Sequence, residues 1–358
     1  MIRYQTANSK TRTQAIQLSI DTFKSNMGDQ FTLLFSQKNQ KHMFLGLDDQ
    51  KVVSMVNYYP SRISIDGVSF LAASIGSVCT NKAYRGQNIA STLLHRAEKQ
   101  MLKESVDFTI ISGSGGIYER FGALDVGYMH EYHLAIDKLQ SSQSLKLRDY
   151  QVQDFDSVYS IYQKEKRRYI RSKNEFKQLL ISQRVPDEDC DYPMVVLTEQ
   201  DKIIGYYIMN RYPKADDIWI KELSGNRNKL YHGFHLLLKY YKKTELRFII
   251  GPKDRLNGLI KVKPFKKITQ EASIRIIHPT SFVTKLNMYL DKKHETCRVF
   301  YNGNYQIFKD EKTYIMDDKT FTLWVFGHPK KSVNNPNEPQ KVVGIPLPLP
   351  WSHNLNYQ

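Results

Sequence analysis

Residues 76–91 read Gly76-Ser77-Val78-Cys79-Thr80-Asn81-Lys82-Ala83-Tyr84-Arg85-Gly86-Gln87-Asn88-Ile89-Ala90-Ser91. The pattern predicts a strand over residues 76–80, a short loop, and a helix from about residue 88 to 104. A helix N-terminus has unpaired backbone N–H groups and a partial positive charge, so small residues there let a diphosphate approach the backbone. The guanidinium group of Arg85 adds positively charged hydrogen-bond donors. The alternative is an ordinary strand-to-helix connection with an exposed arginine.

A glycine-rich segment follows the next predicted strand, residues 108–112. It reads Ser112-Gly113-Ser114-Gly115-Gly116-Ile117-Tyr118-Glu119-Arg120-Phe121-Gly122-Ala123. A tyrosine phenol has an ordinary pKa of about 10, so it is protonated at neutral pH and can give a proton to a thiolate of ordinary pKa about 8.5. The alternative is that Tyr118 only anchors the loop through its ring.

Together the two segments resemble the GNAT acetyltransferase superfamily. Residues 85–90 are similar to its R/Q-x-x-G-x-G/A acyl-CoA motif, and residues 118–123 to its Y-E-x-F-G-F segment. Residues 115–118, followed by Arg120-Phe121-Gly122, are most similar to the Eis-type (enhanced intracellular survival) acetyltransferases. The resemblance implies an N-acetyltransferase that uses acetyl-CoA and no metal, with an amine-bearing small molecule or peptide as acceptor.

The motif departs from the family at one position, because Asn88 stands where the family usually has glycine. Asparagine tolerates unusual backbone angles better than most residues, and its side chain is capable of capping a helix. We therefore expect weaker coenzyme binding rather than none. Asn88→Gly is predicted to tighten it.

The resemblance also implies roles for individual residues. Backbone N–H groups of Val78, Cys79 and Thr80 are expected to hold the pantetheine arm and polarise the thioester carbonyl, so Cys79 need not be a nucleophile. Tyr118 falls on the family's general acid. The C-terminal carboxylate of Gln358 falls on its base, and a docked or frayed terminus is the alternative. The other residues expected at the coenzyme are Arg85, Gly86, Gln87, Asn88, Ile89, Ala90, Ser91, Ser112, Gly113 and Ser114.

An internal repeat indicates the domain organisation. Lys51-Val52-Val53-Ser54 is echoed by Lys202-Ile203-Ile204-Gly205, roughly 150 residues later. The predicted fold class is mixed α+β and α/β, with mostly antiparallel sheets and flanking helices. The resemblance to Eis-type proteins implies tandem GNAT domains, the second of them degenerate, followed by a sterol-carrier-protein-like α+β domain. The predicted domains are residues 1–140, 145–272 and 273–358, with a linker over 140–144. In the second copy, residues 224–230 lack the motif spacing, which indicates a structural role.

Residue patterns predict further elements along the chain. In the first domain they predict a strand over residues 2–5, a helix over 11–23, and strands over 42–47, 52–59 and 68–80 with turns at 48–50 and 66–67. In the second they predict a strand and helix over 145–163, a strand over 217–223, a helix over 229–243 and a strand over 246–250. In the third they predict a strand over 274–277, a helix from about 279, and strands over 296–301, 305–308, 313–316 and 320–326.

Composition excludes several classes of protein. A hydrophobic fraction of 41% is typical of globular chains, and no apolar run predicts a membrane helix or secretory signal, so we expect a cytoplasmic protein. Cys79, Cys190 and Cys297 have neither disulfide-framework nor zinc spacing. The net charge of +16 attracts anions in general. Basic residues 164–173 are interpreted as a solvated helix face with a buried stripe, rather than a nucleic-acid patch.

Other readings stay open. A GNAT-derived protein that binds CoA or another ligand without turnover is the main alternative to an enzyme, and a nucleic-acid binder ranks last. We expect no nucleic-acid or membrane partner, and by resemblance a homo-oligomer, a hexamer. Asp21 and Glu119 are candidates to meet a cationic acceptor but also suit a helix surface, and His95 is interpreted as part of a helix face.

Overall fold

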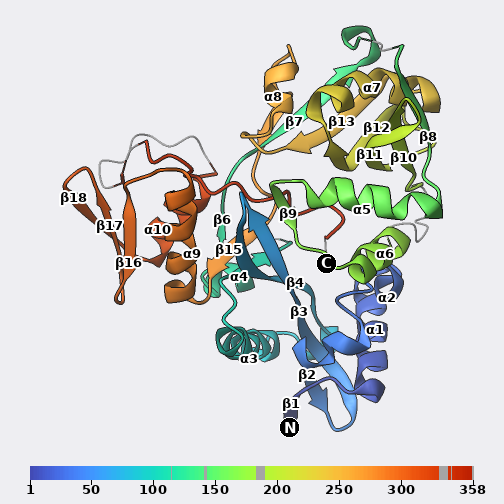
Figure 1. Ribbon diagram of the computed structural model, residues 1–358. Coiled ribbons are helices and arrows are strands. Elements are labelled where there is room, and N and C mark those ends of the chain that lie inside the picture. Colours follow the sequence, from blue (N-terminus) through green and yellow to red (C-terminus); the bar gives the residue numbers. More distant parts are fainter. Residues whose placement is uncertain (114, 141–142, 183–189, 330–337, 340, 357–358) are drawn as a thin grey trace. The chain divides into compact units, whose positions relative to one another are not determined.

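A computed structural model describes all residues except 114, 141–142, 183–189, 330–337, 340 and 357–358. The chain divides into two compact units (Figure 1). Unit 1 comprises Met1–Gly127, Gln270–Leu347 and Asn356–Gln358, and unit 2 comprises Tyr128–Thr269 and Pro348–Leu355. Within the described part of the chain, no helix is long and apolar enough to cross a membrane.

Unit 1 is built on a mixed sheet in which β4 and β5 are parallel and the other neighbours along the strand order are antiparallel. The order is β1–β2–β3–β4–β5–β15–β6. These strands are β1 (Ile2–Thr6), β2 (Met43–Asp48), β3 (Lys51–Ile65), β4 (Val68–Thr80), β5 (Phe108–Ile111), β15 (Ser273–Ile276) and β6 (Leu124–Asp125). The predicted turns at residues 48–50 and 66–67 connect β2 to β3 and β3 to β4.

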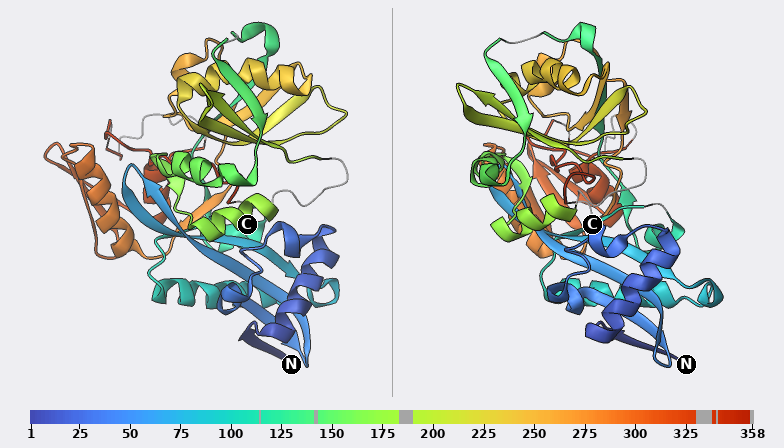
Figure 2. Two further views of the ribbon diagram at one scale, coloured as in Figure 1. Left: turned by 45° about the vertical axis from the view of Figure 1, so that its right-hand side comes forward. Right: turned by 90° about the vertical axis from the view of Figure 1, so that its right-hand side faces the viewer.

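Two long helices cover opposite faces of this sheet (Figure 2). Met43 and Leu45 of β2 pack in a cluster with α1 (Ser9–Phe23), whereas Phe44 between them packs in a cluster with α3 (Ile89–Lys103). This alternation is the period of two expected for a strand buried on both faces. The shorter helical segments are α2 (Met27–Gln30), η1 (Gln37–His42), η2 (Lys82–Tyr84) and α4 (Gly116–Arg120).

The C-terminal part of unit 1 packs on the same sheet through aromatic side chains. The Phe282 ring lies 5.7 Å from Phe70, 6.1 Å from Phe108 and 5.5 Å from Phe326, measured between ring centroids. The buried Asp107 carboxylate accepts hydrogen bonds from Ser281 Oγ at 2.7 Å and Lys285 Nζ at 2.5 Å. The elements here are α9 (Pro279–Lys292), β16 (Arg298–Tyr301), β17 (Tyr305–Lys309), β18 (Lys312–Met316) and α10 (Asp318–Phe326).

Unit 2 repeats the central topology of unit 1. Its sheet has the order β14–β7–β13–β12–β11–β10–β8, again with one parallel pair, β12 and β13, joined by a long helix. The strands are β7 (Met129–Ala135), β8 (Leu145–Asp149), β10 (Met194–Glu199), β11 (Lys202–Asn210), β12 (Asp217–Gly225), β13 (Glu245–Ile250) and β14 (Lys266–Ile268). The other elements are η3 (Ile136–Lys138), η4 (Val152–Asp154), α5 (Phe155–Gln163), β9 (Arg167–Tyr169), α6 (Lys173–Ser182), α7 (Arg227–Tyr241) and α8 (Leu256–Leu259).

Two strands pair outside the domains to which the sequence pattern assigned them. β7, which precedes the predicted linker, lies between β13 and β14 of unit 2, and β15, at the start of the predicted third domain, lies between β5 and β6 of unit 1. Strand pairing over such separations leaves no local signal in the sequence. A separate third domain therefore stays a prediction, since residues 273–347 belong to the compact unit 1 and residues 348–355 to unit 2.

Two predicted elements are wrong. Residues 320–326 lie in the helix α10, which begins where the Asp317 side chain accepts a hydrogen bond from the backbone N–H of Thr320 at 2.7 Å. Residues 164–173 are not one helix face, because α5 ends at Gln163 and the short strand β9 follows. Arg171 is buried there in a bidentate ion pair with Glu222, with N–O distances of 2.8 and 2.7 Å.

Candidate active site

The central strand β4 parts from its parallel neighbour before it ends. It pairs with β5 from Ala72 to Ile75, where β5 finishes at Ile111. It continues to Thr80 along β3, so that Cys79 lies opposite Met55. Within the described sheet, the far edge of residues 76–80 therefore lacks a ladder partner, and backbone N–H groups on that edge are available to a ligand.

A bulge in this segment changes the direction of the backbone. The register between β3 and β4 shifts between Met55 and Asn57, and Ser77 has a φ of 51°, which is unusual for a residue other than glycine. Such a bulge re-aims the groups that follow it and is frequent next to functional sites. The sequence pattern missed it, and Gly76 inside a predicted strand was the one available signal.

The N-terminus of α3 has no side-chain cap. Asn88 stands at the capping position with φ 56° and ψ 16°, a left-handed backbone of the unusual kind that asparagine tolerates better than most residues. The prediction that its side chain is capable of capping is not realised, because a capping side chain usually needs an extended backbone at that residue. The first helical amides, those of Ile89, Ala90 and Ser91, are left to bind another acceptor.

Most residues of the loop before α3 are exposed. Gly86 has a φ of 80°, and a Cβ there would meet nothing within 4 Å, so glycine is needed for its backbone angle rather than for space. Gln87 and Arg85 are exposed. The Nε of Arg85 donates to the carbonyl of Thr80 at 3.3 Å, which tethers this cation to the end of β4.

Tyr118 lies in α4, directly after the glycine-rich loop. Its side chain is half-buried and packs against the same cluster as Val78, to which the first residue of α3, Ile89, contributes. The structure therefore brings the end of β4, the start of α3 and Tyr118 to one face of the sheet. Gly113 in the loop is exposed with a φ of 108°, whereas Ser114 lies outside the described residues.

Cys79 has the properties of a structural residue. It is buried against the α1 face of the sheet, the face opposite to the cluster with Tyr118. Burial raises the pKa of its thiol to about 12, so the thiol is protonated at neutral pH. Its neighbour Thr80 is within 2.8 Å of the Ser54 hydroxyl, measured between the two oxygens.

The other candidate residues lie on the surface or outside the described chain. His95 is exposed on α3, with Nδ1 3.3 Å from Glu98. Asp21 is exposed and accepts a hydrogen bond from Gln17 at 2.9 Å, and Glu119 is exposed on α4. Gln358, the predicted base, lies outside the described residues.

Comparison with known proteins agrees with this geometry. Residues 3–124 match the family model described as an acetyltransferase (GNAT) domain. The chain shares its fold with Eis1 from Mycobacterium abscessus (11% identity, 90% of this chain and 88% of that chain covered, TM-score 0.66). It also shares it with a GCN5-related N-acetyltransferase from Anabaena variabilis (13% identity, 88% and 85% covered, TM-score 0.66).

A third structure with this fold is a probable N-acyltransferase from Enterococcus faecalis (15% identity, 90% and 88% covered, TM-score 0.66). Among curated protein sequences, none matches the chain. The TM-scores show a shared fold, and the match to the acetyltransferase (GNAT) domain model covers the N-terminal residues 3–124.

Proposed function

Because residues 3–124 form an acetyltransferase (GNAT) domain, a domain of acyl-CoA N-acyltransferases, we propose that this chain transfers an acetyl group from acetyl-CoA to an amine acceptor. One observation carries the proposal. The uncapped start of α3 follows a strand, β4, whose last five residues have one edge without a ladder partner in the described sheet. Uncapped helix amides bind a diphosphate, and an unpaired strand edge offers hydrogen bonds to an extended thiol arm.

The proposed coenzyme contacts follow from this geometry. The N–H groups of Ile89, Ala90 and Ser91 bind the diphosphate, and the Arg85 guanidinium adds a charged donor. The exposed backbone of Gly86 and Gln87 lies on the approach to these amides. Farther along, the amides of Val78, Cys79 and Thr80 hold the pantetheine arm, with Ser112, Gly113 and Ser114 proposed on its other side.

The proposed chemistry is a direct transfer. The neutral amine nitrogen attacks the thioester carbon, the C–N bond forms, and negative charge develops on the carbonyl oxygen. Amide N–H groups beyond the bulge at Ser77 stabilise that charge. The C–S bond then breaks, the sulfur leaves as a thiolate, and the amine gives up its proton to a base. The proposed base is the C-terminal carboxylate of Gln358.

Tyr118 is proposed to return a proton to the leaving thiolate. Its half-buried ring packs in the cluster that includes Val78, which supports a place beside the sulfur end of the coenzyme. A phenol is a weaker acid than a thiol in water, with an ordinary pKa of about 10 against about 8.5, so proton transfer from Tyr118 to the thiolate depends on hydrogen bonding and on a position close to the sulfur.

The remaining segments are proposed from the fold. The shared order of β8–β10–β11–β12–β13 and β1–β2–β3–β4–β5 supports residues 145–272 as a second, degenerate GNAT-like domain. The helices α9 and α10 around a three-stranded sheet support residues 273–358 as a sterol-carrier-protein-like domain. Both assignments rest on topology alone.

The test is an amine panel with acetyl-CoA, in which released thiol is followed and CoA binding is measured separately. Tyr118→Phe is expected to lower kcat by at least about 100-fold with CoA affinity unchanged, as loss of general acid catalysis does. Tyr4→Phe is the matched control, since Tyr4 packs on the same cluster but its ring lies under Arg96. Full activity of Tyr118→Phe would remove the general-acid role. CoA binding without turnover of any amine would instead favour a binding protein.

A further inference from the structure

Unit 2 contains the same strand–helix–strand arrangement as the candidate site, but its connection is much shorter. β12 ends at Gly225 and α7 begins at Arg227, so Asn226 alone joins them, whereas residues 81–88 join β4 to α3. The Asn226 side chain accepts hydrogen bonds from the backbone N–H groups of Asn228 at 3.0 Å and Lys229 at 3.2 Å. The helix amides that are uncapped in unit 1 are therefore occupied in unit 2.

A carboxylate occupies the donors that lie beside this helix start. Glu165 Oε1 accepts from the Ser224 hydroxyl at 2.7 Å, from the Gly225 N–H at 3.0 Å and from Arg227 Nη1 at 2.8 Å. Glu165 Oε2 accepts from Arg227 Nη2 at 2.9 Å. A hydroxyl, a backbone amide and a guanidinium fork directed at one group are the donors that also bind a tetrahedral oxyanion.

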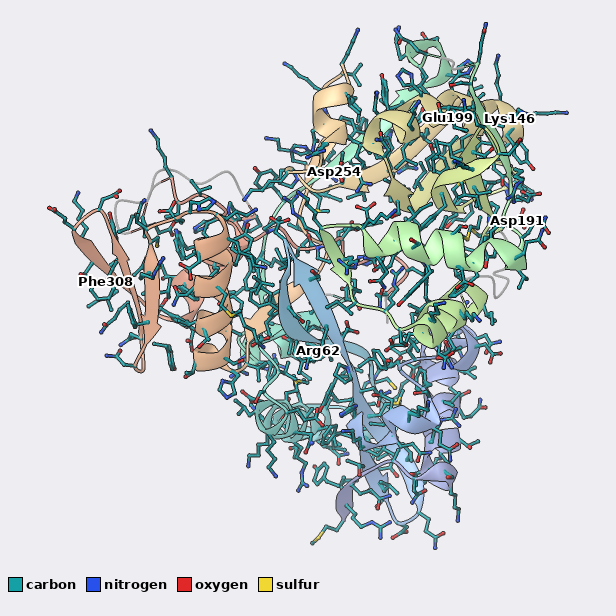
Figure 3. All side chains as sticks on the ribbon, in the orientation of Figure 1. Arg62, Lys146, Asp191, Glu199, Asp254 and Phe308 are labelled. Atoms are coloured by element: carbon teal, nitrogen blue, oxygen red, sulfur yellow. The ribbon has the colours of Figure 1, made fainter. Side chains whose placement is uncertain are left out.

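The guanidinium of this set is held in place from its other side. Arg227 Nε donates to Asp254 Oδ1 at 3.1 Å, and the same Asp254 oxygen accepts the N–H of Leu256 at 2.9 Å (Figure 3 labels Asp254). The side chains of Glu165, Arg227 and Asp254 are exposed by only 18–19%. We therefore expect Asp254 to hold Arg227 in position when the Glu165 carboxylate is removed.

We propose that Glu165 is a built-in anion that closes a latent oxyanion site in unit 2, and that removal of its carboxylate lets a free phosphate or sulfate bind there. While Glu165 is in place, its carboxylate occupies these donors, so they are not available to a free oxyanion. The anion site rests only on contacts within unit 2, so its test is independent of whether the first domain is an active transferase.

The experiment measures the thermal midpoint, Tm, of the full chain against inorganic phosphate, with sodium chloride at matched ionic strength as reference. Glu165→Ala is expected to have a lower Tm than wild type and to regain at least about 2 °C with a saturable dependence on phosphate, because a ligand of the folded state alone stabilises it. The matched control is Glu199→Ala, which removes a carboxylate bonded to Lys229 of the same helix at 2.6 Å (Figure 3).

Further variants decide between a built site and a basic surface. The double variant Glu165→Ala with Arg227→Ala is expected to lose the phosphate gain. If Glu165→Ala does not fold, Glu165→Ser supplies a small polar side chain that leaves room for phosphate at the Gly225 N–H, and its Tm is expected to rise with phosphate more than that of Glu199→Ala. The proposal is overturned if phosphate raises the Tm of the Glu165 variants no more than that of Glu199→Ala, or if the double variant retains the gain.

Discussion

Substitution of Asn88 by glycine, alanine and valine isolates the effect of the left-handed backbone at the start of α3. Asn88 has φ 56° and ψ 16°, and its side chain makes no capping hydrogen bond. Substitution therefore changes the energetic cost of the left-handed backbone without removing a capping hydrogen bond. A left-handed backbone costs an L-residue about 1–2 kcal/mol, a cost that glycine does not carry. We therefore expect alanine to cost about 1 kcal/mol and valine about 2 kcal/mol relative to asparagine.

The cost appears in one of two measurements. If the loop keeps its geometry without coenzyme, the cost lowers the free energy of unfolding in urea. If the loop relaxes, the cost appears in the Kd for CoA, where about 1.4 kcal/mol is tenfold. For Asn88→Gly we expect CoA to bind up to a few-fold more tightly, as measured by titration calorimetry.

Ser105 supplies the control, since it has a φ of 55°, is exposed, and follows the opposite end of the same helix. With α3 spanning Ile89–Lys103, it lies on the order of 20 Å from the proposed diphosphate site. Ser105→Ala and Ser105→Gly are expected to change the unfolding free energy but not the Kd for CoA. Weaker CoA binding by Asn88→Gly, or identical stability and Kd for the alanine and glycine variants, would refute the reasoning.

Two other predictions concern groups away from the proposed chemistry. Burial raises the pKa of the Cys79 thiol to about 12, so a disulfide reagent at pH 8 is expected to leave this thiol unmodified in the folded protein and to label it in urea. Cys79→Ala is expected to retain turnover. Loss of turnover would restore Cys79 as a candidate nucleophile. Burial alone would raise the pKa of Glu104, but hydrogen bonds from Gln100, His42 and Tyr58 lower it from 4.5 to about 2. The ionised carboxylate therefore stabilises the fold above pH 4.5, and this stabilisation is lost as the pH falls toward 2. Glu104→Gln should lack this contribution, and equal acid-unfolding profiles for wild type and variant would contradict it.

The sequence predicted elements whose determinants are local. Residues 66–67 form the turn between β3 and β4, where Asp66 and Gly67 take the positive φ angles of 48° and 86° that such a turn needs. The helix predicted over residues 88–104 is α3, because its buried Ile89, Leu93, Leu94 and Ala97 recur at helical spacing. Both signals lie within a few residues of the structure that they specify.

Features set by distant contacts were missed or misplaced. The bulge at Ser77 depends on the register of β4 against β3, and Gly76 marks an irregularity in the strand without specifying that register. Arg171 reads as a surface charge within a basic run, but a glutamate 51 residues later makes its burial possible. For α10, a run of β-branched and aromatic residues favours a strand, whereas the Asp317 cap and the packing of Phe321, Trp324 and Val325 favour the helix that is observed.

The length of one connection accounts for the different helix starts in the two units. In unit 2 the single residue Asn226 leaves β12 with an extended backbone, at φ −66° and ψ 115°, and enters α7 with its side chain on the helix amides. In unit 1 the eight-residue connection ends in the left-handed Asn88, whose side chain makes no bond to the helix start, so the same kind of residue leaves the amides open. A polar residue before a helix therefore does not by itself show that the helix amides are capped. In this chain, the capped and the uncapped helix start differ in the number of residues between strand and helix and in the backbone angles of the last one.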